Sequence, residues 1–363
     1  MALTLPDFPW DSLVPFGDRA RQHADGIIDL SVGSPVDPTP AVIRDSLAAA
    51  TDAHSYPQTS GTPALREAIA AWYARRRGVE GLTAANVIPT IGSKELVALL
   101  PLLLGVGKGD AVVLPSVAYP TYAIGAALVG AEAVAIDDPA AWPANTKLVW
   151  LNSPGNPDGS VLTVEQLRAA VERARELGAV IVNDECYAEF GWDVATPTPS
   201  ILDPRVIGDS RAGVLAIYSL SKQSNLAGYR AGFMAGCSRL VAQVLEVRKH
   251  IGLMPPAPVQ AAMIAALGDD AHVAAQRELY AARRAVLRPA LEAAGFRIDH
   301  SEAGLYLWAS RDDDCWDTVS WFADRGVLVT PGSFYGGSAG RHVRVALTST
   351  DAAISAAAAR LAV

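Results

Sequence analysis

The residue with the clearest chemical potential is Lys222, which ends the segment Ser219-Leu220-Ser221-Lys222 and stands eight residues before Arg230. A lysine amine can form a Schiff base with an aldehyde. An arginine and two hydroxyl groups nearby can hold a phosphate close to that aldehyde. Only five lysines stand among the thirty basic residues, so an amine nucleophile has few candidates. A lone lysine is more often a solvated surface residue, and other segments must decide between the two interpretations.

Asp184 and Asn156 lie in two further polar segments that could complete such a site. A carboxylate such as Asp184, in the sequence Asp184-Glu185-Cys186-Tyr187, can pair with a protonated pyridine nitrogen and make that ring an electron sink. Asn156 could donate a hydrogen bond to a phenolic oxygen on the ring, opposite Tyr187. Taken singly, the first segment is also typical of a helix cap, and the region around Asn156 is typical of a turn.

A glycine and a serine offer a third element, at Ile91-Gly92-Ser93-Lys94. A Gly-Ser turn that opens a helix presents free backbone N–H groups and the positive end of the helix dipole to an anion. An ordinary N-cap by Ser93 is the competing interpretation. The combination of these segments with Lys222 is more specific than any one of them.

Apolar strands that alternate with helices would position these segments. We expect strands at 110–114, 147–151, 179–182 and 214–218, and helices at 62–78, 93–104 and 163–177. This alternation predicts an α/β fold with a mainly parallel sheet, whose ligands bind beyond the carboxyl ends of the strands. The polar segments 152–159, 184–187 and 219–222 each follow a strand, which is where a site would form.

Two kinds of signal define the expected helix ends. Thr163 and Gln166 fit a capping box, and Gly178 fits a helix stop. Pro101 is expected to kink or end the helix at 93–104.

Changes in composition and in the predicted elements along the chain indicate an N-terminal arm and two domains. Residues 1–45 are rich in proline and turn signals and are expected to form an extended arm that packs with a small domain. Residues 46–245 are expected to form the large domain. Residues 246–363, with helices at 241–251 and 271–294 and strands at 305–308, 327–330 and 343–346, are expected to form a smaller α+β domain.

Composition narrows the class of protein. The chain has 363 residues, is half hydrophobic and carries a net charge of −8, so a basic nucleic-acid surface is not indicated. No run approaches the roughly 18 apolar residues that span a membrane. The first residues lack the pattern of a secretory signal, and the three cysteines indicate neither a disulfide framework nor a metal site. These features predict a cytoplasmic protein.

Taken together, the segments resemble the fold-type I pyridoxal 5′-phosphate (PLP)-dependent aminotransferases of class I/II, over nearly the whole chain. The resemblance is strongest in Asn156-Pro157-x-Gly159, in Asp184-Glu185-x-Tyr187, and in Ser219-x-Ser221-Lys222 with Arg230. It implies the fold-type I architecture, PLP as cofactor, and amino acids and keto acids as substrates.

The resemblance also implies roles for individual residues. The implied catalytic residues are Lys222 as Schiff-base lysine and proton shuttle, Asp184 as partner of the ring nitrogen, and Tyr187, which contacts the ring 3-oxygen together with Asn156. The implied phosphate site is made by Gly92, Ser93, Lys94, Ser219 and Arg230, while Tyr119 resembles the aromatic residue that stacks on the ring. Tyr56 is similar to a tyrosine that reaches the phosphate of a neighbouring subunit, which implies a homodimer. Gly33, Asn156 and Arg344 are the implied contacts to the substrate carboxylate, with Arg341 a competitor for the role of Arg344.

The opening segments 5–10 and 29–38 look like those of the actinobacterial N-succinyldiaminopimelate aminotransferases. That resemblance implies glutamate as amino donor and N-succinyl-2-amino-6-oxopimelate as acceptor, in lysine and diaminopimelate biosynthesis. Three alternatives stay open: an aminotransferase for aspartate, alanine or an aromatic amino acid, a PLP-dependent C–S lyase, and a PLP-sensing regulatory domain. The last needs a DNA-binding module, for which we see neither room before residue 30 nor a basic helix.

Overall fold

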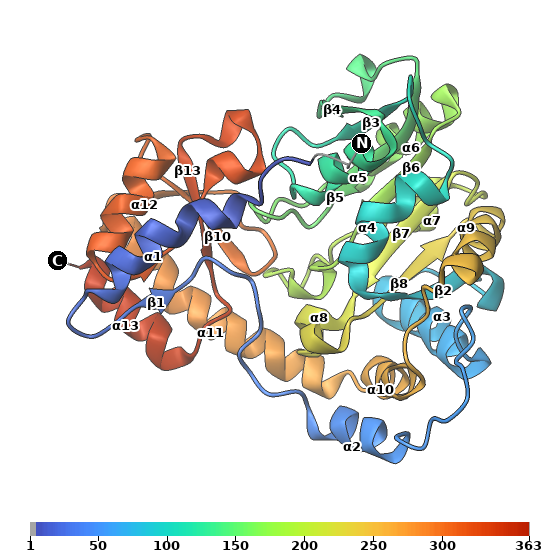
Figure 1. Cartoon of the computed structure of the whole chain (residues 1–363), viewed down its shortest axis with the longest axis horizontal. Coiled ribbons are helices and arrows are strands. Elements are labelled where there is room, and N and C mark those ends of the chain that lie inside the picture. Colours follow the sequence, from blue (N-terminus) through green and yellow to red (C-terminus); the bar gives the residue numbers. More distant parts are fainter. Residues whose placement is uncertain (1–4, 363) are drawn as a thin grey trace.

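Two large β-sheets and a two-stranded one organise the chain, for which the computed structural model describes residues 5–362 (Figure 1). The larger sheet has seven strands in the order β2-β8-β7-β6-β5-β3-β4. All its neighbouring strands are parallel except those that pair with β8, which is antiparallel to both neighbours. The strands are β2 Val87–Ile91, β3 Ala111–Leu114, β4 Glu132–Ala135, β5 Thr146–Asn152, β6 Val180–Asp184, β7 Val214–Ser219 and β8 Ala231–Gly236.

Helices cover both faces of this sheet. One face packs against α2, α3, α6, α7 and α10, and the other against α4, α5 and α9. Their bounds are α2 Ala41–Ala49, α3 Pro63–Arg77, α4 Gly92–Leu103, α5 Thr121–Val129, α6 Val164–Leu177, α7 Pro204–Ile207, α9 Ser238–Ile251 and α10 Ala257–Gly268. The predicted α/β class with a mainly parallel sheet is confirmed.

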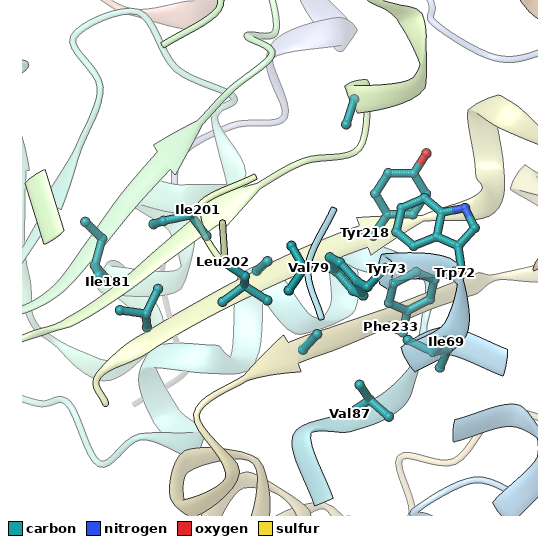
Figure 2. Close-up of a cluster of buried hydrophobic side chains, with 14 of the residues drawn as sticks. Ile69, Trp72, Tyr73, Val79, Val87, Ile181, Ile201, Leu202, Tyr218 and Phe233 are labelled. Atoms are coloured by element: carbon teal, nitrogen blue, oxygen red, sulfur yellow. The ribbon is translucent and has the colours of Figure 1, made fainter. Parts of the chain in front are cut away.

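Strand β7 shows why the sheet is buried on both sides. Its side chains alternate, so that Tyr218 joins the core on one face and Ile217 joins the core on the other. Figure 2 shows the first core, in which Trp72 of α3 lies against Tyr218, with 4.5 Å between ring centroids, and against Phe233 of β8. A strand buried on both faces reads as a continuous apolar run, which is how the sequence predicted it.

The smaller sheet has four antiparallel strands in the order β12-β13-β10-β9. They are β9 Arg297–Asp299, β10 Tyr306–Ser310, β12 Thr330–Pro331 and β13 His342–Ala346, and they pack with α11 Ala271–Ala293, α12 Cys315–Asp324 and α13 Asp351–Leu361. In Figure 1 the long helix α11 runs from beside the larger sheet to the smaller one. This helix therefore contacts both halves of the molecule.

The N-terminal arm is not the extended segment that its prolines and turns suggested. It contains a 3₁₀ turn at Pro9–Leu13, helix α1 at Val14–Arg21 and the short strand β1 at Ile28–Asp29, which pairs with β11 at Val327–Leu328. Helix α1 packs on α12, where the ring centroids of Phe16 and Trp316 are 5.4 Å apart. Burial of such apolar residues against a distant helix outweighs the local turn preference.

The predicted helix punctuation is found at α6, where Thr163 and Gln166 form the capping box and Gly178 takes the left-handed conformation. Pro101 lies inside α4, which continues past it to Leu103, so the proline does not end the helix. Helix α10 packs with α2 and α3 in the core on one face of the larger sheet. Within residues 5–362, no helix is both long and apolar enough to cross a membrane.

Candidate active site

The carboxyl ends of β5, β6 and β7 open into a cavity of about 510 Å³, a size that suits a cofactor with a small substrate. Most of the predicted site residues line it: Gly33, Ser93, Lys94, Tyr119, Asn156, Asp184, Tyr187, Ser219, Lys222, Arg230 and Arg344. The remaining two, Gly92 and Tyr56, lie outside this lining. The structure thus gathers residues from both sheets and from the N-terminal arm into one place.

Lys222 lies on the one-turn helix α8, Leu220–Gln223, directly after β7. Ser219 caps this turn by accepting a hydrogen bond from the Ser221 backbone N–H at 3.2 Å. The Lys222 amine donates to the carbonyl oxygen of Gly33, in the loop of residues 30–40 that joins β1 to α2 (the N-terminal loop). Burial lowers the pKa of Lys222, which increases the fraction present as nucleophilic amine at neutral pH.

Asp184 is a buried carboxylate at the end of β6. Its Oδ2 accepts from the hydroxyl of Tyr122 at 3.0 Å, and its Oδ1 accepts from the backbone N–H of Cys186 at 3.2 Å. Burial raises the pKa of Asp184, and no lysine or arginine within residues 5–362 forms an ion pair with it. A cationic partner would therefore stabilise this carboxylate. Tyr122, on α5, stacks on Trp150 with 5.0 Å between ring centroids and was not among the predicted site residues.

Cys186 places a second nucleophilic side chain in the same cavity. Burial raises the pKa of its thiol well above the usual value, and the neighbouring Asp184 adds to that effect. The thiol is therefore neutral near pH 7 and a poor nucleophile.

The residues predicted to bind a phosphate come together where Arg230 meets the start of α4. Gly92 has φ of 68°, and a Cβ there would lie 2.4 Å from a guanidinium nitrogen of Arg230. This contact explains why the predicted glycine matters although it does not line the cavity. Ser219 donates to Ser221 at 2.8 Å, and Arg230 donates to the carbonyl of Ala227 at 2.8 Å without an ion pair in the described part of the chain. Its positive charge is thus available to an anion.

Arg344, on β13, is a buried cation that faces the same cavity and is only 3% exposed. It donates to Asn156 Oδ1 at 2.9 Å and to the carbonyl of Ser31 at 2.6 Å, while its Nε has no partner. Both of these acceptors are neutral, and residues 5–362 provide no carboxylate to pair with it. Arg341, the competing candidate, lies outside the cavity lining and donates instead to the carbonyl of Asp312 at 3.3 Å.

Two tyrosine hydroxyls meet beside Arg344. The oxygens of Tyr187 and Tyr306 are 3.1 Å apart, and the guanidinium carbon of Arg344 lies 4.0 Å from the centroid of the Tyr306 ring. Burial raises the pKa of Tyr187. Burial also acts to raise the pKa of Tyr306, but the cations Arg344 and Lys222 outweigh it and lower that pKa below the usual value. No local pattern singled out Tyr306, which lies on β10 of the small sheet.

The remaining predicted tyrosines lie in different surroundings. Tyr119 lines the cavity and packs edge-on against Tyr122, with ring centroids 5.9 Å apart. Tyr56, between α2 and α3, is 97% exposed and contacts no part of this cavity. The Tyr56 side chain is therefore accessible for contact with another molecule.

An aromatic mouth, which we define as Phe8 and Trp10, closes one side of the cavity. Their rings stack with centroids 5.5 Å apart, and Trp10 lies 5.3 Å from Phe334 of the small domain. The Lys94 amine lies 5.6 Å from the centroid of the Phe8 ring. These residues were not predicted to line the site, because their segment was interpreted as part of an arm and used only for its family resemblance.

The fold and the site define a class of enzyme, and comparisons with known proteins agree. The family model for aminotransferase class I and II matches residues 25–361. The chain is 56% identical to the 4-dedimethylamino-4-oxo-anhydrotetracycline transaminase OxyQ of Streptomyces rimosus, over 98% of this chain and 99% of that one. It is 54% identical to the "Probable aminotransferase Rv1178" of Mycobacterium tuberculosis, over 99% and 86% of the two chains. A solved structure described as a "probable N-succinyldiaminopimelate aminotransferase" from Thermus thermophilus has a TM-score of 0.89 at 28% identity, over 98% and 99%.

The chain belongs to the class I and II aminotransferases. Enzymes of this family use pyridoxal 5′-phosphate, and the described residues fit that group. The unpaired Arg230 beside the N-terminus of α4 suits its phosphate, the buried Asp184 suits its ring nitrogen, and the Lys222 amine suits its aldehyde. Among residues 5–362 no cluster of metal-binding side chains is found.

Proposed function

We propose that this chain transfers an amino group from glutamate to N-succinyl-2-amino-6-oxopimelate, with Lys222 as the residue that binds the cofactor and moves the proton. The observation that supports an amino-acid substrate is that the buried guanidinium of Arg344 has no carboxylate partner among residues 5–362. A buried guanidinium that lacks a carboxylate is costly, and a substrate carboxylate would supply the missing charge. Its planar fork also suits bidentate binding of a carboxylate.

The roles of the chain's own residues follow from their contacts. The bound cofactor supplies an aldehyde and an electron-withdrawing ring. Lys222 would hold the aldehyde, and its freed amine would take the Cα proton; burial lowers the pKa of Lys222, which increases the share of the neutral amine that this role needs. Asp184 keeps the ring nitrogen protonated, and Arg344 orients the substrate by its carboxylate. Asn156 and Tyr187 would contact the ring oxygen from opposite sides.

The acceptor is supported by two likenesses. The opening segments 5–10 and 29–38 resemble those of succinyldiaminopimelate aminotransferases, and the Thermus structure that carries this description matches nearly the whole chain. The cavity also reaches outward to Lys94, which places one cation near its mouth.

A second candidate acceptor is a ketone carried on a planar ring system. It is favoured by the aromatic mouth, because Phe8 and Trp10 offer flat apolar surface where a substrate body would enter. The name of the relative from Streptomyces rimosus describes a substrate of that kind. The two candidates are distinguished by direct comparison of their rates.

We also propose a homodimer, in which Tyr56 of one protomer completes the phosphate site of the other. The support is its 97% exposure and its place on a loop beside the larger domain. Sedimentation analysis together with the cofactor affinity of Tyr56→Phe tests this proposal. A monomer that binds the cofactor with unchanged affinity would overturn it.

The first experiment follows the near-ultraviolet and visible absorbance of the protein with its cofactor. We expect a band from the Lys222-bound cofactor that glutamate converts to that of the amine form. Lys222→Ala should lose the band and lower kcat about 10⁴-fold or more, because it removes both the attachment and the proton carrier. Lys249→Ala is the control, since Lys249 is an exposed residue of α9 and pairs with Glu246 at 2.6 Å.

The same protein is then supplied with each acceptor in turn. A kcat/KM for the succinylated keto acid well above that for the ring ketone supports the first candidate, and the reverse order supports the second. If glutamate leaves the spectrum of the wild-type protein unchanged, the donor assignment is wrong.

A further inference from the structure

Helix α11 carries a row of buried polar side chains that faces both the N-terminal loop and the Lys222 turn, defined as residues 219–225. His272 hydrogen-bonds Ser224 at 2.8 Å, and Arg283 forms two hydrogen bonds to Asp37, at 2.6 and 2.8 Å. Gln276 lies between them and is 6% exposed. Polar groups buried to this extent are retained only when their hydrogen bonds are satisfied.

Gln276 bonds both segments at once. Its Nε2 donates to Asp37 Oδ2 at 2.8 Å, and its Oε1 accepts from Asn225 Nδ2 at 2.8 Å. A primary amide suits this place because it offers a donor and an acceptor on one rigid group. Asn225, with φ of 54°, follows Lys222 by three residues, so this bond acts on the turn that carries the lysine.

The N-terminal loop needs such an anchor because only one of its ends is fixed by the sheets. Near β1, the Ser31 carbonyl accepts from Thr330 and from Arg344, both at 2.6 Å. At the other end, Gln276 and Arg283 hold Asp37, while Thr39 donates to the Asn225 carbonyl at 3.0 Å and Asn225 donates to the Pro38 carbonyl at 3.3 Å. Gly33 lies between these anchors, and a Cβ there would lie 1.9 Å from the Tyr306 hydroxyl. The space around Gly33 is therefore narrow, and a small displacement of the loop would change its distance to Lys222.

We propose that Gln276 is a positioning residue, which joins Asp37 to Asn225 and thereby fixes the Gly33 carbonyl against the Lys222 amine. The proposal rests on the proposed role of Lys222 as proton carrier. The freed amine then returns to the same carbonyl during each turnover, which keeps it within reach of the proton it moves. A displacement of about 1 Å from such a geometry can lower a rate by as much as ~10²-fold.

The first test is amide hydrogen exchange in the cofactor-free protein, which does not depend on catalysis. Gln276→Leu should speed exchange roughly tenfold in peptides covering residues 30–39 and 223–229, with the rest of the chain unchanged. Glu278→Gln, an exposed position on the same helix, is the matched control and should match the wild type. Unchanged exchange in both segments, or equal acceleration throughout the chain, would overturn the proposal.

The second test replaces Gln276 with a titratable residue, so that amide exchange in the N-terminal loop should depend on pH more than it does in the wild type. In Gln276→Glu the new carboxyl can donate to Asp37 only while protonated, and once ionised it repels that carboxylate. Burial and Asp37 raise the pKa of the new carboxyl, while Arg283 opposes them. We therefore expect near wild-type exchange at about pH 5 and roughly tenfold faster loop exchange at about pH 8, each relative to wild type at the same pH. The titratable groups facing this position are Asp37, His272, Tyr280, Arg283 and, through Arg283, Asp351.

Kinetics complete the test. With glutamate, Gln276→Leu should slow the half-reaction about tenfold and change the half-saturating concentration less than about twofold, because Arg344 keeps its own anchor at Ser31. A Gln276→Glu protein whose exchange and rate do not vary with pH beyond the wild type would refute the positioning role. A wild type that forms no Lys222-bound cofactor would instead refute the proposed function, and the exchange results would still stand.

Discussion

The floor of the cavity and its mouth are built by different physical means. The floor, made by Asp184, Lys222 and Arg344, is buried and fixed by hydrogen bonds, which are 2.6–3.2 Å long at Asp184 and Arg344, while Lys222 donates to the Gly33 carbonyl. The mouth is made by aromatic rings, and Phe8 is 55% exposed. Hydrogen bonds in a buried site demand one geometry, whereas stacked apolar rings tolerate several. The floor thus suits a single reaction, and the mouth suits the choice among substrates.

Among changes to the floor and the mouth, we expect Arg344→Lys in the floor to have the largest effect on activity. A lysine cannot form the bidentate fork, so kcat/KM for glutamate should fall about 100-fold, or ~3 kcal/mol of transition-state stabilisation. Arg341→Lys is the control, because Arg341 lies outside the cavity. Steady-state kinetics with both variants measure the effect, and similar losses in the two would mean that Arg344 does not bind the carboxylate.

A smaller and more selective effect is expected from Trp10→Ala. Loss of the indole should lower kcat/KM for the preferred acceptor about tenfold, while the half-reaction with glutamate changes less than about twofold. Rates with each acceptor measure this difference. Equal losses in both half-reactions would show that the mouth does not act on substrate choice.

The smallest effect is expected on the stability of the cofactor-free protein. Asp184→Asn should raise that stability although it lowers the activity of the loaded enzyme. The folded-state pKa of Asp184 is raised, so the cofactor-free protein loses stability as pH rises through that pKa. Asp184→Asn should therefore melt at a higher temperature than wild type near pH 7, a difference that disappears in acid, while the loaded enzyme loses activity. Calorimetry of the cofactor-free proteins across pH measures it, and a lower Tm at pH 7 would contradict the account.

The contrast also explains how much the sequence could predict. Lys222, Asp184 and Asn156 follow strands in short continuous segments, so local pattern was enough to place them in one site. Tyr306 comes from the small sheet, Trp10 comes from the arm, and Tyr122 occupies an apolar helix. Their positions depend on tertiary packing between distant segments, for which a local pattern carries no signal.

The same limit applies to the fold. Strands buried on both faces and helices with caps were predictable, because each has its own local pattern. Helix α1 was not, because its burial depends on α12, about 300 residues away along the chain. The role that we propose for Gln276 could likewise not be predicted, because it depends on contacts with Asp37 and Asn225, which are distant in the sequence.

The burial of Cys186 has a consequence for chemoselectivity. Two nucleophilic groups, the amine of Lys222 and the thiol of Cys186, line the same cavity. The low-dielectric surroundings act on them in opposite directions, because they disfavour the ammonium of Lys222 and also disfavour the thiolate of Cys186. A single environment therefore favours the neutral amine of Lys222 as a nucleophile and disfavours the thiolate of Cys186, so that a bound aldehyde would react with nitrogen rather than with sulfur.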